Sequence, residues 1–362
     1  MNETDPNTTD LTHRPIRRRP RRPTVAVLAC LAALSAIAGC ATPTTSAAPV
    51  PAKIAVPATI SAKQLAGLTL NVGDQKAGLQ ALLTAAGELK DSPYKIKWST
   101  FTSGPPLLEA VNAGAVDIGG VGNTPPIFSA AAGGKIVIIS AARTSAAGDA
   151  ILVPKGSTVR TVADLKGKRV AVAQGSSAHG NLLLQLKKAG LGTADVQITF
   201  LTPSDGYAAL AAGRVAAWAV WDPYTAQAEQ QLGARVLASG RGLANGLSFQ
   251  VASRAALADP RRNSAIQDLV ARTVRAYIWS KTHHQQWARV YASQTALPYA
   301  VTLASALRSG DDPITLSPQI AASEQQLADA FANAKVIPTR PTISSIIDTR
   351  YNQSVISQGA HS

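Results

Sequence analysis

Short apolar runs alternate with stretches of helical periodicity along the chain from Leu68 onward. Turn-forming residues bound each run, and the stretch after it carries apolar residues three and four positions apart. Repeated strand–helix–strand units with short connections predict an α/β fold whose sheets are largely parallel and covered by helices on both faces. The expected strands are 68–74, 94–101, 116–122, 135–142, 150–154, 170–173, 195–202, 216–222, 234–240 and 247–253.

The same pattern predicts two lobes. Strands 150–154 and 247–253 share one apolar character, and we interpret them as paired strands that cross between the lobes and form a hinge. After Ser253 the pattern turns helical, with helices expected at 264–282, 284–293, 299–308 and 317–333 that return to the first lobe. The predicted domains are a signal peptide at 1–39, a flexible tether at 40–65, lobe I at 66–153 and 248–340, lobe II at 154–247 and a C-terminal tail at 341–362.

The N-terminus carries a targeting signal. An arginine-rich segment at 14–22 precedes an apolar run at 25–38 that is too short to span a bilayer as a helix, although a single transmembrane anchor is the alternative. The segment IAGC at 37–40 resembles a bacterial lipobox, which implies cleavage before Cys40 and acylation of Cys40. The paired arginines are also similar to a twin-arginine signal, but the residues that usually follow are absent, so the export route stays open.

Cysteine usage fits export and anchoring. The chain has two cysteines, Cys30 in the apolar run and Cys40 at the lipid site, so a chain cut before Cys40 holds no disulfide and no cysteine metal site. Residues 41–63, rich in Thr, Ser, Pro and Ala, read as a flexible tether. His283 and His284 are adjacent, so their side chains diverge on a helix and predict no metal site.

The chain is basic, with a formal net charge of +14. Removing residues 1–39 takes away six arginines and three acidic residues, which leaves +11. These charges are scattered, no aromatic and basic platform accompanies them, and an export signal precedes them, so a nucleic-acid partner is not expected. A positive domain instead suits the surface of an anionic membrane and small anions.

Three turns predict an anion site. Gln174 to Ser177 follow the strand at 170–173, and Ser176 or Ser177 caps a helix at 178–189, so the positive end of the helix dipole lies at the carboxyl end of a strand. The turns SGPP at 103–106 and NTPP at 123–126 also place a capping residue before prolines that suit a first helical turn. Carboxyl ends of strands in an open sheet meet at one edge, so these turns predict a shared cleft.

Four segments of the chain are distinctive: GDQKAGLQALL (73–83), SGPPLLEAVNAGAVDIGGVGNTPPIF (103–128), ILVPKGSTVRTVADLKGKRVAVAQGSSAHGNLLL (151–184) and AWAVWDPY (217–224). They resemble the solute-binding proteins of ABC importers, and most of all their aliphatic sulfonate-binding branch, which neighbours the taurine and nitrate binders. The resemblance covers about residues 66–340. It implies a type II periplasmic-binding fold and capture of a ligand between the lobes, without catalysis or a cofactor.

The resemblance also implies partners and a location. The expected partners are an alkanesulfonate as a small anionic ligand, an ABC permease with its ATPase subunits, and the membrane through the lipid anchor. The protein is expected outside the cytoplasm, anchored to the bacterial cell membrane as a monomeric lipoprotein that serves sulfur acquisition. Many relatives carry Asp where this chain has Asn123, so an amide stands in the turn at 123–126 instead of a carboxylate.

A sulfonate stays ionised and only accepts hydrogen bonds, so its site needs donors and no proton acceptor. Hydroxyl, amide and backbone N–H groups at the three turns meet that need, and Trp221 supplies an apolar wall for a carbon tail, whereas Trp218 points to the other face of its strand and belongs to the core. The residues expected at the ligand are Gln75, Ser103, Gly104, Asn123, Thr124, Ser176, Ser177, His179, Trp221 and Asp222.

Two alternatives stay open. The first is another ligand: related clefts accept taurine, nitrate, riboflavin or a thiamine precursor through small changes in shape. The second is an enzyme in which Ser177 and His179 act as nucleophile and base. Against it, position 179 lacks the glycine of a nucleophile elbow, and no acid that would orient the histidine is evident. A ligand that returns chemically unchanged separates binding from catalysis.

Overall fold

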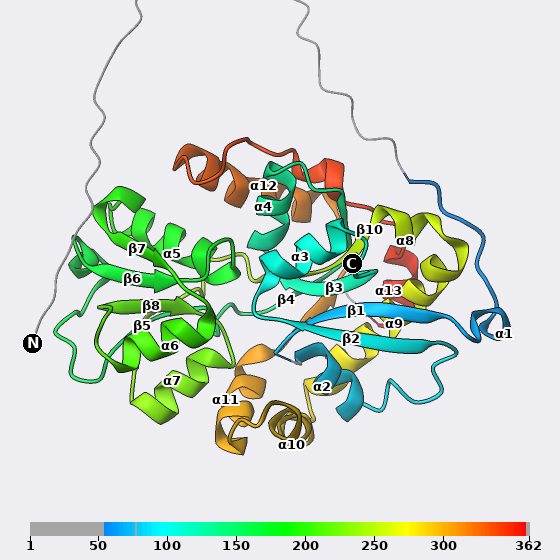
Figure 1. The fold of residues 1–362 in the computed structure, drawn as a ribbon, viewed down its shortest axis with the longest axis horizontal. Helices are drawn as coiled ribbons and strands as arrows, with labels where there is room; N and C mark the ends of the chain where they lie inside the picture. The colour runs from blue at the N-terminus through cyan, green and yellow to red at the C-terminus, as the bar shows by residue number, and fades with distance from the viewer. Residues whose placement is uncertain (1–53, 77, 360–362) are drawn as a thin grey trace, which may run out of the picture. The chain divides into compact units, whose positions relative to one another are not determined.

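The computed structural model describes residues 54–76 and 78–359. The expected signal peptide, Cys40 and the first part of the tether lie outside the described residues. Two β-sheets with helices on both faces form the frame, which confirms the α/β class (Figure 1). We call the sheet that contains β1 and its helices the first lobe, and the other sheet with its helices the second lobe.

The first sheet has six strands in the order β11-β4-β10-β3-β1-β2. The inner strand β1 is parallel to both of its neighbours, whereas β10 lies antiparallel between β3 and β4. The sheet is therefore mixed, and the expectation of a largely parallel sheet holds only for its β3-β1-β2 half. The strands are β1 (Thr69–Gln75), β2 (Lys95–Phe101), β3 (Ile118–Gly122), β4 (Ile136–Arg143), β10 (Leu247–Ser253) and β11 (Asp312–Ile314).

Helices cover both faces of the first sheet (Figure 1). One buried cluster joins α2, α9 and α10 to the sheet, and a second joins α3, α4 and α12 to it. The helices of this lobe are α1 (Ala62–Leu65), α2 (Gly78–Ala85), α3 (Gly104–Asn112), α4 (Thr124–Ala131), α8 (Arg254–Ala258), α9 (Pro260–Ser280), α10 (His284–Thr295), α11 (Tyr299–Ser309), α12 (Pro318–Asn333) and α13 (Asn352–Ser357).

The second sheet has five strands in the order β7-β6-β8-β5-β9. Here β6 is parallel to β7 and β8, and β5 runs antiparallel between β8 and β9. One buried cluster contains α5 and another contains residues of α6 and α7, and Trp218 is buried in the core as expected. The elements are β5 (Ala150–Val153), β6 (Arg169–Val172), α5 (Ser177–Lys188), β7 (Gln197–Phe200), α6 (Pro203–Ala211), β8 (Ala217–Val220), α7 (Tyr224–Leu232) and β9 (Arg235–Ser239).

The two connections between the sheets differ from the prediction. β5 and β10 do not pair with each other, because β5 belongs to the second sheet and β10 to the first. The chain instead crosses at 143–150 and 239–247, where the backbone N–H of Thr144 donates to the carbonyl of Gly246 at 2.8 Å and that of Gly240 donates to Asp149 at 2.8 Å. Apolar character marked both strands as buried but could not assign each to its sheet.

The chain ends also pack more closely than expected. Residues 341–359, expected as a tail, include a bridge from Ile347 to β4 and the helix α13, and Tyr351 is buried in the first-lobe core. The last part of the expected tether packs too, since Leu65 is buried and the carbonyl of Ile54 accepts a bond from Arg350 at 2.9 Å. The apolar residues of these two segments form no long periodic pattern, so the sequence did not predict that they pack on the first lobe.

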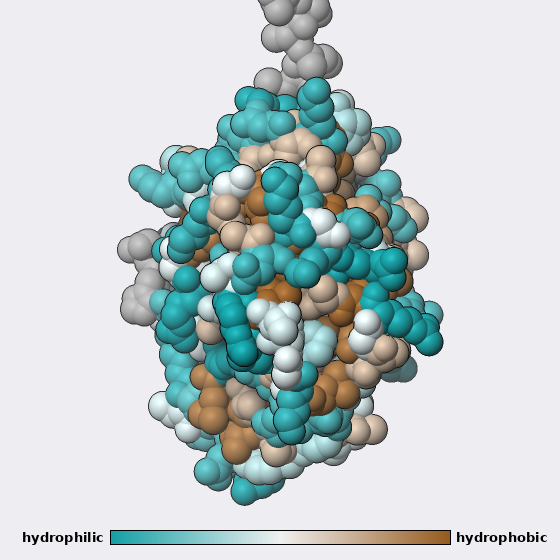
Figure 2. All heavy atoms as spheres, turned by 90° about the vertical axis from the view of Figure 1, so that its left-hand side faces the viewer, coloured by the Kyte–Doolittle hydropathy of each residue, from teal (hydrophilic) through white to brown (hydrophobic). Residues whose placement is uncertain are grey.

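Hydrophilic residues cover most of the second-lobe end of the molecule, and hydrophobic residues lie in separate groups between them (Figure 2). Phe200 at the end of β7 is one of the exposed large apolar side chains there. Scattered apolar residues of this kind are ordinary on a protein surface. Within the described part of the chain, none of the helices has the length and hydropathy that a bilayer span requires.

Candidate functional site

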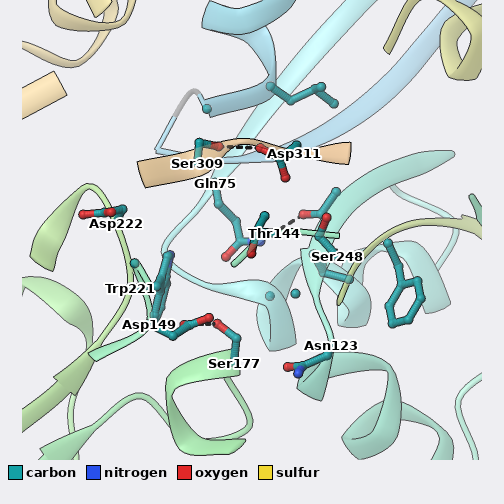
Figure 3. A pocket seen from close by; sticks show the side chains of 18 of the residues that line it. Gln75, Asn123, Thr144, Asp149, Ser177, Trp221, Asp222, Ser248, Ser309 and Asp311 are labelled. Atoms are coloured by element: carbon teal, nitrogen blue, oxygen red, sulfur yellow. Dashed lines mark hydrogen bonds between the residues drawn. The ribbon is translucent and has the colours of Figure 1, made fainter. Parts of the chain in front are cut away.

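A cavity of about 280 Å³ lies where the two lobes meet. The first lobe contributes the ends of β1 and β3, the start of α3 and parts of α9, α10 and α11, and the second lobe contributes the start of α5 and the segment after β8. Figure 3 shows Gln75, Asn123, Ser177 and Trp221 around this space. The cavity is small and polar at several points, which suits a small ligand rather than a macromolecule.

The three turns that the sequence singled out share this cavity. Seven of the ten expected ligand residues line it: Gln75, Gly104, Asn123, Ser176, Ser177, Trp221 and Asp222. The other three, Ser103, Thr124 and His179, are buried but are not among the lining residues.

The starts of α3 and α4 lie against each other at the cavity. A Cβ at Gly104 would come within 2.3 Å of the ring of Pro125, so only glycine allows this approach. Neither Ser103 nor Asn123, the residues that precede the two helices, accepts a capping bond with its side chain. Both helices therefore present a positive dipole end without a side-chain cap, and both ends suit an anion.

The start of α5 differs, because its donors already have partners. The hydroxyl of Ser176 donates to the carbonyl of Ala173 at 2.7 Å and accepts from the N–H of His179 at 3.3 Å. The hydroxyl of Ser177 donates to Asp149 at 2.8 Å rather than facing the cavity unbound. The prediction that both hydroxyls are available to a ligand therefore needs this correction.

His179 holds the turn before α5 in place. Its Nδ1 accepts the backbone N–H of Gly175 at 3.1 Å, and its ring lies among the rings of Phe128, Phe200 and Phe331 at 5.3–5.8 Å between centroids. Burial lowers the pKa of His179 to about 4, so the ring is neutral at pH 7. Its side chain neither lines the cavity nor accepts a proton from Ser177, which removes the geometry of the proposed nucleophilic pair.

Asp149 is a cavity residue that sequence reasoning missed. It lies just before β5, and the hydroxyl of Ser177 and the nearby start of α5 stabilise its carboxylate. Burial raises the pKa of Asp149 to about 6, and the charge of Asp222 contributes to the rise. An acidic residue in front of an apolar strand was the available signal, but it marks many turns and is not specific.

Arg308 is a second missed residue, and it joins the lobes. From α11 of the first lobe it donates to Asp222 through Nε at 2.9 Å and Nη2 at 2.8 Å, and through Nη1 to Glu229 of α7 at 2.5 Å. Arg308 and Asp222 both line the cavity. Asp222, expected to contact the ligand, thus already has a bidentate cationic partner.

A chain of two side-chain hydrogen bonds fixes Asn123. Its Nδ2 donates to Asn245 at 2.8 Å, and Nδ2 of Asn245 donates to Glu324 of α12 at 3.0 Å. Burial raises the pKa of Glu324 to about 8. Asn245 belongs to one of the two crossings between the sheets, so the position of the Asn123 amide depends on the connection between the lobes.

Two lining side chains hold a buried polar atom without a partner. They are the indole N–H of Trp287 and the side-chain oxygen Oε1 of Gln250. Both atoms are enclosed by protein, and each costs free energy as long as it is unpaired. Among the described residues no cluster of side chains has the composition of a metal site.

The chain is similar in sequence to a known family and to a protein named for sulfonate binding. The model of the NMT1-like family matches residues 54–295. An Escherichia coli (strain K12) protein named for aliphatic sulfonate binding is 38% identical over 280 residues, which is 76% of this chain and 86% of that protein.

Solved structures agree with this similarity. The alkanesulfonate-binding protein of Xanthomonas axonopodis pv. citri, bound to MOPS, superposes with a TM-score of 0.72 at 34% identity, over 78% of this chain and 99% of that one. The periplasmic aliphatic sulphonate binding protein of Escherichia coli does so with a TM-score of 0.67 at 36% identity, over 77% and 92%. A desulfurization enzyme, at 17% identity and a TM-score of 0.55, is similar in fold alone. The fold is therefore the two-lobed type II periplasmic-binding fold.

Proposed function

The chain belongs to the NMT1-like family and to the family of the aliphatic sulfonate-binding proteins of ABC importers, and on this premise we propose that it captures a small sulfonate in the cavity between its lobes. The observation that carries the proposal is the meeting of the starts of α3 and α4, both without a side-chain cap, at one cavity. A sulfonate carries a permanent negative charge and three acceptor oxygens, which these helix starts complement. The ligand leaves unchanged, because the proposed role is binding and delivery.

The head group lies, in this proposal, between the starts of α3 and α4 and Ser177, whose hydroxyl is released from Asp149 when that carboxyl takes up a proton. Charge-assisted hydrogen bonds contribute about 1.5–3 kcal/mol each, so a few of them supply the roughly 8 kcal/mol of micromolar binding. Trp221, half-buried and packed edge-on against Tyr224, gives the carbon tail an apolar wall.

The carboxyl of Asp149 has a specific role in this arrangement. An anion brought close to it raises its pKa further above 6, so Asp149 takes up a proton when the sulfonate binds at neutral pH. The protonated carboxyl is then a donor instead of a repelling charge. An aspartate at the cavity is in this way compatible with an anionic ligand.

The cellular setting follows from the N-terminal residues and the family. We propose export, acylation of Cys40, and a monomeric lipoprotein that delivers its ligand to an ABC permease and its ATPase subunits for sulfur acquisition. Loss of radiolabelled palmitate in Cys40→Ala tests the anchor, and globomycin-sensitive processing tests the cleavage. Label that persists in Cys40→Ala would reject the lipid site without affecting the proposed ligand.

Titration calorimetry tests the ligand class. We expect the full chain, purified in a mild nonionic detergent, to bind members of the series from ethane- to hexanesulfonate and to release them unaltered. Nitrate and a simple amine are the contrasting ligands. Heat with nitrate or the amine and none with any sulfonate would assign the chain to another ligand class.

A further inference from the structure

The charges that line the cavity are unbalanced. Arg308 is the single cation among the lining residues, against four aspartates: Asp74, Asp149, Asp222 and Asp311. A sulfonate adds another negative charge to this set. Ionised carboxylates and sulfonates only accept hydrogen bonds, so a plain alkanesulfonate brings no donor for the excess of acceptors in the cavity.

Three of the four carboxylates are compensated within the protein. Asp74 accepts the backbone N–H groups of Gln75, Leu79 and Gln80 at 2.7–3.1 Å and so caps α2. Asp222 has Arg308 as a bidentate partner, and Asp149 has Ser177 and the start of α5.

Asp311 is the exception. It follows α11, accepts a hydrogen bond from the hydroxyl of Ser309, and takes part in none of the ion pairs of the described chain. Its neighbour Asp312, by contrast, pairs with Lys281. Burial raises the pKa of Asp311, as expected for a carboxyl group whose charge lacks a cationic partner.

A second acceptor belongs to another residue that lines the cavity. The buried Oε1 of Gln250, on β10, has no hydrogen-bond partner, and Gln250 is only 6% exposed. Tyr277 connects the two sites, because both the charge of Asp311 and the amide of Gln250 act on its phenol. A carboxylate without a cationic partner and an unpaired carbonyl oxygen, both on residues that line the cavity, match a group with a positive charge and several N–H donors.

This wall is separate from the proposed sulfonate position. In Figure 3, Asp311 and Ser309 lie on one side of Gln75, and Ser177 and Asn123 lie on the other. The path from the starts of α3 and α4 to Asp311 passes Gln75.

We propose that the cavity selects sulfonates whose carbon chain ends in a protonated amine, with Asp311 and the side-chain oxygen of Gln250 as the ammonium subsite. The inference rests on the proposed function, since it assigns the other end of the same ligand. It names the ligand class as aminoalkanesulfonates, in which the amine supplies the donors that the sulfonate lacks.

Pairs of ligands of equal size test the subsite. Titration calorimetry of the full chain in detergent compares 2-aminoethane-, 3-aminopropane- and 4-aminobutanesulfonate with propane-, butane- and pentanesulfonate, in which a methyl group replaces the ammonium. We expect at least a tenfold tighter Kd for the amine at the chain length that spans the cavity. Equal or tighter binding of the alkanesulfonates would overturn the subsite and leave the proposed function standing, whereas no heat from either series rejects both.

Two variants and a neighbouring control locate the effect. Asp311→Asn should weaken aminosulfonate binding at least tenfold and leave alkanesulfonate binding within threefold, and Gln250→Leu should act in the same direction. Asp312→Asn, one residue away and paired at the surface, should change neither Kd by more than about twofold. Equal losses for both ligand classes in Asp311→Asn, with an unchanged melting temperature, would remove Asp311 from the subsite.

Discussion

Individual side chains show where sequence chemistry is informative and where it is not. Hydroxyl and amide groups at Ser177 and Asn123 were expected at the cavity because turns after strands place them there, and both line it. The sequence could not predict that their donors already have partners, because Asp149 and Asn245 come from distant segments and accept hydrogen bonds from Ser177 and Asn123. Arg308 and Asp311 were missed for the same reason, since neither belongs to a motif.

Proton uptake measures the state of Asp149. Its pKa of about 6 lies above the usual range, so the carboxyl is mostly ionised at pH 7, and a bound sulfonate raises the pKa further. We expect the uptake of a substantial fraction of one proton at pH 7, and binding that tightens as the pH falls from 7 to 6. The charge of Asp222, which is paired with Arg308, acts on the same group.

Calorimetry in two buffers of different ionisation heat reads this uptake directly. Asp149→Asn should abolish it, and Asp91→Asn, at an exposed position outside the cavity, should leave it unchanged. A binding heat that does not depend on the buffer, or proton release, would contradict the placement of the sulfonate beside Asp149.

Elements were predicted better than their pairing. Alternation of apolar runs and helical stretches placed α5 and β10 within one residue of their observed bounds. It could not place the antiparallel strands β5 and β10 in their sheets, because a buried strand is apolar whichever neighbours it pairs with. The short elements α8 and β11 were missed, since a few residues carry too little periodicity.

The turn before α5 depends on His179 for its shape, not for ligand contact. His179→Ala removes a buried ring and leaves the N–H of Gly175 without its acceptor, so we expect a loss of about 2–4 kcal/mol in unfolding free energy. The melting temperature should fall by roughly 5–10 °C. His284→Ala, on a less buried residue, is the matched control and should shift it by little. A melting temperature that His179→Ala leaves unchanged would contradict the structural role.

At the scale of the whole molecule, the two lobes were predictable from the sequence but their contacts were not. We propose that the crossings at 143–150 and 239–247 act as the hinge. Three helix pairs join the lobes away from the crossings, namely α4 with α5, α12 with α5 and α11 with α7. Arg308 of α11 forms ion pairs with Asp222 and with Glu229 of α7. The ligand cavity lies beside this ion-pair group.

Loss of the Arg308 ion pairs should favour an open arrangement. We expect Arg308→Gln to increase the radius of gyration of the ligand-free chain in small-angle scattering and to weaken sulfonate binding about three- to tenfold, because fewer molecules occupy the closed state. Arg275→Gln, which breaks a pair with Glu88 inside the first lobe, is the control for loss of an ion pair. Equal effects of the two variants would show that Arg308 does not hold the lobes together.

A crystal structure of the chain with 3-aminopropanesulfonate tests the central claim most directly. The account predicts the sulfonate oxygens within hydrogen-bond distance of the first turns of α3 and α4 and of Ser177, with the chain of the ligand passing Gln75. A sulfonate bound outside this cavity, or one that faces Asp311 instead of the helix starts, would contradict it.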